Sequence, residues 1–137
     1  MACCANVITI ARTGKGKPMR ESDEQAALFL WAAYRPELRL MFHIPNGGSR
    51  NPIEAANLKR QGVKAGVPDV FLPIARHGCH GLFIEMKRTH GGVLSQFQRE
   101  YIEALMREGY RVAVCHGFEE ARKTIEEYMD EKVLSDG

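Results

Sequence analysis

The sequence predicts a single α/β domain in which one mixed β-sheet is flanked by helices. The first reason is that segments with helical spacing of apolar residues alternate with strand-like segments, in the order α, β, α, β, β, α, β, α. The second is size, because 137 residues make one ordinary domain. The third is composition, since 45% hydrophobic and 26% charged residues are typical of a chain with a packed core.

The first elements are expected before residue 45. Val7–Ile10 suits a short strand or an ordered tail. A helix should begin after Ser22, acting as its N-cap, and end at about Tyr34-Arg35, where Pro36 follows. Alternation of apolar and polar residues predicts a strand over Leu38–Ile44.

The middle of the chain predicts a short helix and two strands. The helix should cover Pro52–Gln61, with Gly62 as its stop. The strands should cover Asp69–Ile74 and Leu82–Lys87, joined by a hairpin-like loop, and Pro73 is expected to shorten the first of them.

The last part of the chain predicts a helix, a strand and a helix. Ser95 should cap the first helix, Gln96–Glu108. A strand at Arg111–Cys115 and a helix at Phe118–Tyr128 complete the domain. We expect an amino-terminal extension at 1–20, the folded domain at 21–130 and a carboxy-terminal tail at 131–137.

Composition excludes some classes of protein. A net charge of +2 is too small to identify a nucleic-acid partner by itself. No apolar run approaches the roughly 18 residues that a membrane span needs, and the start lacks the features of a signal peptide. The four cysteines are expected to be reduced thiols, so we expect a cytoplasmic protein without membrane association. The segment His77-Gly78-Cys79-His80 lacks a spaced partner pair for zinc and is interpreted as a turn.

Two acidic residues and a lysine form the most informative pattern. Asp69 starts one expected strand, and Glu85 and Lys87 lie on the next. Alternate side chains of a strand share a face, so Glu85 and Lys87 should point the same way. Pairing of the two strands would bring Asp69 next to Glu85, and a divalent cation would remove the repulsion between the two carboxylates.

This arrangement predicts a magnesium site. Mg²⁺ prefers oxygen ligands and keeps several waters. We expect Asp69 and Glu85 to bind the ion directly, the backbone carbonyl of Met86 to add a third oxygen, and Glu24 to reach the site through a metal-bound water. The ion would activate a water and polarise a phosphate, while Lys87 would orient the nucleophile and balance the charge that develops on phosphorus.

Simpler explanations exist for each of these residues. Pro-Asp is a common turn, and Glu-x-Lys is a common ion pair on an edge strand. Glu24, on the apolar side of its helix, needs a partner, which Arg35 or Lys87 could provide instead of a metal. Gln98 suits an exposed helix position, and Tyr101 suits the core.

Taken together, the motifs resemble the PD-(D/E)XK nuclease superfamily and, more narrowly, VRR-NUC domains. The resemblance covers about Glu21 to Tyr128. The matching segments are helical Glu24, Pro45-Asn46-Gly47-Gly48, Gly66-Val67-Pro68-Asp69-Val70, Glu85-Met86-Lys87 and Ser95-x-x-Gln98.

The resemblance implies a restriction-endonuclease-like fold and phosphodiester hydrolysis that depends on Mg²⁺ or Mn²⁺. It implies metal binding by Asp69 and Glu85 with support from Glu24, catalysis by Lys87 and a positioning role for Gln98. A chain with little beyond this domain looks like the stand-alone VRR-NUC proteins of bacteriophages and bacteria. Those proteins resemble Holliday-junction resolvases and act as homodimers on branched DNA. If the chain is encoded by a phage, we expect it in the cytoplasm of the bacterial host.

Several residues are candidates for contact with DNA. Basic side chains give salt-dependent binding to phosphates without reading sequence. Tyr101, about one helical turn after Gln98, is expected to line the same site. The basic candidates are Arg50, Lys59, Arg60, Lys64 and Arg88. The alternative for many of them is an ordinary solvated surface.

The sequence therefore favours a metal-dependent, structure-selective DNA endonuclease that resolves four-way junctions as a homodimer. A flap or nicking endonuclease with the same active site is the alternative among enzymes. A non-catalytic DNA-binding module and a small zinc module are the alternatives from other classes.

Overall fold

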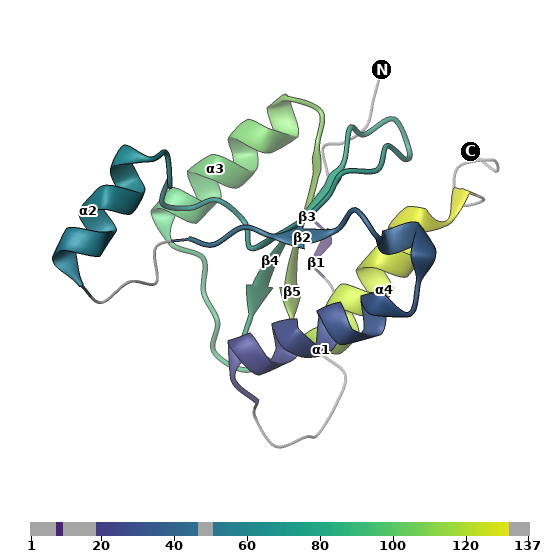
Figure 1. Cartoon of the computed structure of the whole chain (residues 1–137). Coiled ribbons are helices and arrows are strands. Elements are labelled where there is room, and N and C mark those ends of the chain that lie inside the picture. Colours follow the sequence, from purple (N-terminus) through teal and green to yellow (C-terminus); the bar gives the residue numbers. More distant parts are fainter. Residues whose placement is uncertain (1–7, 10–18, 47–50, 132–137) are drawn as a thin grey trace.

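A five-stranded mixed sheet forms the centre of the fold (Figure 1), as expected from the sequence. The computed structural model describes residues 8–9, 19–46 and 51–131. The strands lie in the order β1-β5-β4-β3-β2. They are β1 (Ile8–Thr9), β2 (Phe42–His43), β3 (Val70–Leu72), β4 (Leu82–Lys87) and β5 (Arg111–His116).

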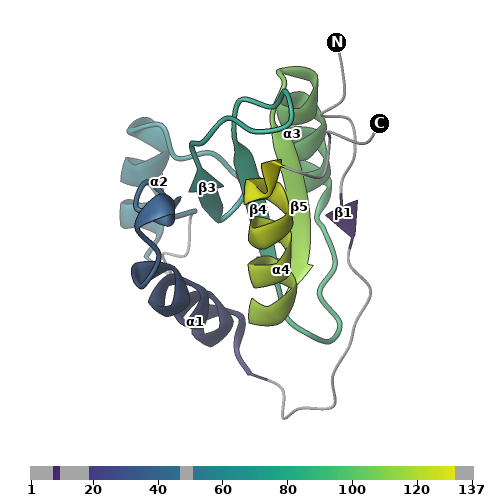
Figure 2. The same ribbon diagram turned by 90° about the vertical axis from the view of Figure 1, so that its right-hand side faces the viewer.

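Helices cover both faces of the sheet. The helices are α1 (Glu21–Ala33), α2 (Pro52–Arg60), α3 (Gln96–Arg107) and α4 (Phe118–Met129), with a 3₁₀ turn, η1 (Pro36–Leu38), after α1. Figures 1 and 2 show α1 and α4 together on one face, α3 on the other, and α2 standing clear of the sheet. The domain is therefore three-layered, and α2 lies outside the layers.

Each face of the sheet has its own apolar core, because strand side chains alternate. Leu82, Ile84 and Met86 of β4 point toward α1 and α4 and pack with Leu28 and Ile125. On the opposite face, Phe83 packs with Ile102 of α3 and with Val112 and Val114 of β5. Glu85 and Lys87 follow Phe83 at every second position, so both lie on the α3 face, as the alternation predicts.

Several predicted elements are confirmed. The strand Leu82–Lys87 has the expected bounds, and α3 begins at Gln96 with Ser95 as its cap. The short helix Pro52–Arg60 ends within one residue of its expected end. The strand expected from Asp69 to Ile74 is shorter, Val70–Leu72, because Pro73 lacks a backbone donor.

Two local predictions are wrong. Only Phe42–His43 of the expected strand Leu38–Ile44 is a strand, and η1 replaces its beginning. Ser22 is not the N-cap of the first helix, because Glu21 is already helical and Arg20 occupies the cap position. The first turn of α1 is therefore two residues earlier than expected, and Glu21 is part of it.

Two residues of the His-rich loop, His77 and Cys79, have bonding partners in the structure. Cys79 is disulfide-bonded, so the expectation of reduced thiols is wrong for this residue, whereas Cys115 is a free and buried thiol. The Nε2 atom of His77 lies 2.8 Å from the carbonyl oxygen of Tyr128. Across the described ranges, no helix is long and apolar enough to cross a membrane. The expected extension 1–20 and tail 131–137 fall mostly outside the described residues.

Candidate functional site

The two acids of the predicted metal site lie across from each other on neighbouring strands. β3 and β4 are antiparallel, with Val70 opposite Ile84, and this register places Asp69 opposite Glu85. Asp69 is held by backbone groups, because its Oδ2 accepts a hydrogen bond from Met86 N at 2.9 Å and its carbonyl accepts one from Ile44 N at 2.7 Å. The pairing predicted from the sequence is present.

Gln98 joins Glu85 to Lys87. Its side-chain Nε2 donates to Glu85 Oε1 at 2.8 Å, and its Oε1 accepts from Lys87 Nζ at 3.0 Å. Lys87 Nζ also lies 3.4 Å from Glu85 Oε1. Both charged side chains are buried, with Glu85 2% and Lys87 9% exposed. Three of the predicted site residues therefore form one buried polar cluster beside Asp69.

The first turn of α3 fixes the position of Gln98. Ser95 and Gln98 form a capping box, in which Gln98 N donates to Ser95 Oγ and Ser95 N donates to Gln98 Oε1 at 2.9 Å. The amide of Gln98 thus completes a helix cap while it contacts the charged pair. The same oxygen accepts from Ser95 and from Lys87, so the start of α3 sets the position of the ammonium group.

A glycine-containing loop packs against the stem of Lys87. A Cβ added to Gly92 would lie 2.8 Å from Lys87 Cβ, which is closer than real Cβ atoms approach. The loop after β4 therefore approaches Lys87 as only a residue without a side chain can. This close approach limits the exposure of the lysine.

Burial and crowding of the acids raise their pKa values. Loss of hydration on burial, the largest cause, and the charge of Asp69 together raise the pKa of Glu85 to about 8, against the opposing effect of Lys87. Burial also raises the pKa of Asp69, against the hydrogen bond from the Met86 backbone. The two carboxylates therefore cannot both be ionised at neutral pH without a cost, which a cation between them would remove.

The chemistry of this pair fits a divalent cation with oxygen ligands. Glu85 Oε2 is buried and accepts no hydrogen bond from the described part of the chain. Within the same residues, no group of three or more His, Cys, Asp or Glu side chains is arranged to hold a metal ion. Two carboxylates suit Mg²⁺ or Mn²⁺, because Mg²⁺ is commonly held by one or two protein carboxylates and keeps waters in its other positions.

Glu24 has a partner other than the site. Its Oε2 accepts a hydrogen bond from Phe118 N at 2.6 Å, at the start of α4. No hydrogen bond or ion pair joins Glu24 to Asp69, Glu85 or Lys87 in the described ranges. Gly117, the N-cap residue of α4, makes no side-chain cap bond, so Glu24 supplies the acceptor from another helix.

Glu21, which the sequence analysis did not select, is the acid of α1 that lies near the site. Burial raises its pKa first and the charge of Asp69 second, while Lys87 and Arg88 lower it. Glu21 and Glu24 are three residues apart and share one side of the helix. The expected start at Ser22 had left Glu21 outside the helix, which is why it was missed.

His43 is a second neighbour that the sequence analysis missed. Its Nδ1 lies 2.7 Å from the carbonyl oxygen of Asp69, and its charge lowers the pKa of Asp69. A carbonyl can only accept, so Nδ1 must carry the hydrogen in this contact. His43 reaches Asp69 because β2 pairs with β3, and these strands are far apart in the sequence. No local sequence motif predicts this pairing.

The remaining candidates are distributed around the site. Met86 donates its N–H to Asp69, and its carbonyl as a metal ligand stays a prediction. Arg88 is exposed directly after β4, Tyr101 is half-buried on α3, and Arg50 lies outside the described residues. Lys59, Arg60 and Lys64 are exposed on α2 or just after it.

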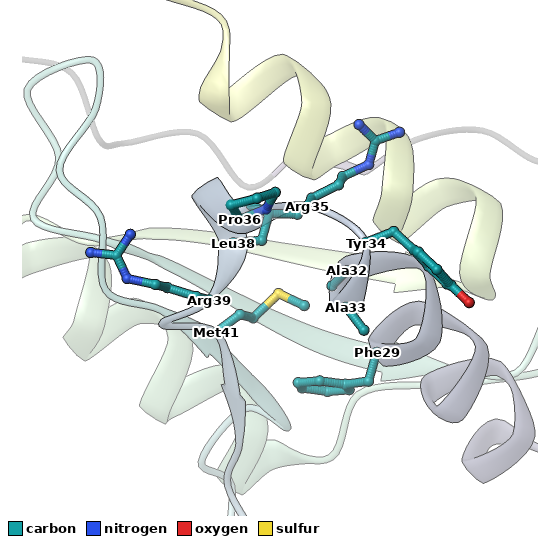
Figure 3. A pocket seen from close by; sticks show the side chains of 9 residues that line it. All are labelled: Phe29, Ala32, Ala33, Tyr34, Arg35, Pro36, Leu38, Arg39 and Met41. Carbon is teal, nitrogen blue, oxygen red and sulfur yellow. The ribbon is translucent and has the colours of Figure 1, made fainter.

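A separate hollow lies away from these residues, at the end of α1 (Figure 3). Phe29 and Met41 point into it, whereas Arg35 and Tyr34 extend outward. Its lining consists of Phe29, Ala32, Ala33, Tyr34, Arg35, Pro36, Leu38, Arg39 and Met41. None of the predicted site residues lines this hollow.

Comparison with known proteins gives the same family that the motifs suggest. The family model of the VRR-NUC domain matches residues 19–119. A solved structure described as a VRR_NUC domain protein is 34% identical, with a TM-score of 0.73, covering 84% of this chain and 92% of that chain. None of the curated proteins matches the chain.

The raised pKa of Glu85 predicts a pH-dependent stability. An acid whose pKa is higher in the folded state stabilises the fold below its unfolded value, and this contribution is lost as pH rises through the folded value. Without divalent ions, we expect the free energy of unfolding to fall by on the order of a few kcal/mol between about pH 4.5 and 8. Urea unfolding at several pH values in EDTA measures this fall, and Glu85→Gln should flatten it. An equal fall in the variant would contradict the assignment.

The different partners of Glu21 and Glu24 predict different consequences of the same substitution. Glu24→Ala leaves a helix N-terminus without its acceptor and should lower the free energy of unfolding by about 1–3 kcal/mol. Glu21→Ala should have little effect on stability but should weaken Mn²⁺ binding, measured by titration calorimetry. If the Glu24 variant bound Mn²⁺ more weakly than the wild type but kept its stability, the prediction would be contradicted and Glu24 would be assigned to the metal site.

Proposed function

Because the chain belongs to the VRR-NUC domain family of phosphodiester-hydrolysing nucleases, we propose that it is a metal-dependent, structure-selective DNA endonuclease. We propose further that it resolves Holliday junctions as a homodimer. The observation that carries the proposal is the cluster of buried Glu85 and Lys87 with half-buried Asp69 and Gln98, in which one carboxylate oxygen of Glu85 accepts no hydrogen bond from the described residues.

The proposed chemistry uses Mg²⁺ or Mn²⁺ held between Asp69 and Glu85, with the Met86 carbonyl as a further ligand. When bound, the ion would make a hydroxide available near neutral pH and polarise the phosphate. Asp69 is kept in place for this role by the Met86 N–H and Ile44 N–H. Asp69 and Glu85 would hold the ion as ionised carboxylates, and the charge of the ion would offset their mutual repulsion.

Lys87 and Gln98 would act on the phosphate side of the reaction. The ammonium group of Lys87 is held 3.0 Å from Gln98 Oε1, so it is oriented before the substrate arrives. From this position it would orient the attacking water and stabilise the negative charge that develops on phosphorus. Gln98 contacts both Lys87 and Glu85, which makes it a positioning residue.

Glu21 is proposed for the supporting role that the sequence analysis assigned to Glu24. Glu21 lies close enough to Asp69, Lys87 and Arg88 for their charges to shift its pKa. Its carboxylate could accept a hydrogen bond from a metal-bound water. Glu24, in contrast, accepts from the α4 backbone.

Contacts with DNA are proposed for the basic residues near this cluster. Arg88 follows Lys87 and is exposed, and Tyr101 lies on α3 about one turn beyond Gln98. Arg50 stays a candidate from its position in the sequence. Two copies related by a two-fold axis would suit a junction, because it carries two symmetric sites of cleavage.

Substitution of the cluster residues should abolish cleavage. We expect Asp69→Ala, Glu85→Ala or Lys87→Ala to lower single-turnover cleavage of branched DNA with Mn²⁺ by about 100-fold or more, because each removes a metal ligand or the charge near phosphorus. Lys123→Ala, an exposed lysine on α4, is the matched control and should cleave like the wild type. Wild-type turnover in any cluster variant would refute the role of that residue.

The preferred substrate can be tested with a panel of four-way junctions, flaps, duplexes and single strands. Junction resolution predicts paired, symmetric nicks, and they should appear only with Mg²⁺ or Mn²⁺. Preferred cleavage of the flap or isolated nicks would favour the flap or nicking alternative. Binding of branched DNA without cleavage in either metal would favour a non-catalytic module.

A further inference from the structure

Helix α2 is an exposed projection from the fold. None of its residues is buried, and Figures 1 and 2 show it apart from the other helices. Its first turn is capped by Asn51, whose side chain accepts from Ile53 N at 2.9 Å. After its last turn, Gly62 N donates to Lys59 O at 3.1 Å and Val63 N to Leu58 O at 3.0 Å. Both ends are thus closed, although the helix has only nine residues and little core contact.

The base of this projection is fixed next to the acids of the candidate site. Asn46 Nδ2 donates to Val67 O at 2.9 Å, joining the chain before α2 to the chain after it. A Cβ on Gly66 would overlap the carbonyl oxygen of Phe97, so the returning chain presses directly on the first turn of α3. Asp69 and Gln98 follow these contact points by three residues and one residue, respectively. We call α2 together with residues 61–66 the arm.

The arm carries unpaired positive charge. Glu54 is the one acidic residue among positions 51–64, against three basic residues, Lys59, Arg60 and Lys64. In the described part of the chain, none of these three forms an ion pair.

Some other surface arginines are neutralised within the protein: Arg122 pairs with Glu119 and Glu126, and Arg20 pairs with Asp23. Arg39, Arg107 and Lys123 are exposed and form no ion pair among the described residues. The arm differs from these isolated cations because its three cations are close together in the sequence and its base is fixed beside the candidate site.

We propose that the arm binds the sugar-phosphate backbone of a duplex flank beside the scissile phosphate, and that this contact sets how much duplex the substrate needs. This inference rests on the proposed function. A nine-residue helix spans about 13 Å, which corresponds to roughly four steps of 3.4 Å along one DNA strand. Cations at the far end of α2 and just beyond it would neutralise phosphates along such a flank, without contact to bases.

The test is the dependence of binding on flank length. Fluorescence anisotropy without divalent ions measures the affinity for forked DNA whose single duplex flank has 20 or 4 base pairs and is closed at its far end by a stable hairpin loop, which keeps the short flank paired. The arm variant carries Lys59→Glu, Arg60→Glu and Lys64→Glu together. A control variant carries Arg39→Glu, Arg107→Glu and Lys123→Glu, which are exposed cations elsewhere with the same total change in charge.

We expect the wild type and the control to bind the long flank about tenfold more tightly than the short one, and the arm variant to bind both flanks equally weakly. Loss of three phosphate contacts should also lower the salt slope of binding by about 3. Thermal unfolding confirms that both variants are folded. The proposal is overturned if the arm variant keeps the full dependence on flank length, if the control loses it equally, or if the wild type binds no DNA.

Cleavage of the same forks by the wild type with Mn²⁺ is scored separately. Flank-dependent binding without any cleavage would support the arm and contradict the proposed catalytic activity. Cleavage that does not depend on the flank would support the activity and contradict the arm.

Discussion

The site depends on the hydrogen bonds that the side-chain amide of Gln98 makes. It donates to Glu85, accepts from Lys87 and completes the cap of α3 with Ser95. An amide can serve both charges because it carries a donor and an acceptor on one rigid plane. The helix start and the charged pair are therefore positioned by the same side chain, so folding of α3 onto the sheet and assembly of the site are one event.

Glu24, Glu85 and Glu120 are the buried acids in the described part of the chain, and the partners of Glu24 and Glu85 separate the roles of these two residues. Glu24 has a backbone N–H of α4 as its partner, which is typical of an acid that stabilises a helix start. Glu85 has an amide and an ammonium group on one oxygen and no donor on the other. Glu85 differs from Glu24 in its unsatisfied oxygen and in its position beside Asp69 and Lys87. Glu120 also has an unsatisfied oxygen, but its other oxygen accepts a hydrogen bond from the backbone N–H of His116.

The sequence predicted the parts of the fold that depend on local signals. β4 begins with three apolar residues and continues with alternating charged and apolar residues, and α3 has a capping box, so both were placed correctly. The segment after Pro36 failed because burial there does not alternate: Leu38 and Met41 are buried, three positions apart, as in a turn. The strand was predicted because Leu38, Leu40, Phe42 and Ile44 alternate in the sequence, but Leu40 and Phe42 are exposed in the structure.

Among the residues around the candidate site, too, the sequence indicated those that depend on local patterns and missed those that depend on the exact helix start or on tertiary pairing. Asp69, Glu85 and Lys87 follow from strand periodicity and simple pairing, which a sequence displays. Glu21 depends on where a helix begins, and the strong cap signal of Ser22 hid it. His43 reaches Asp69 only through pairing of β2 with β3, and no local pattern carries that information.

The hydrogen bond between Asn46 and Val67 has a consequence for how this domain can vary. It closes the chain excursion at its root, so the number of residues beyond it is independent of the sheet register that holds Asp69. Doubling the length of such an excursion costs only about 0.6 kcal/mol in closure entropy. Insertions and deletions between Asn46 and Val67 should accordingly be among the least disruptive in the chain. We therefore expect related proteins to differ in length in this segment.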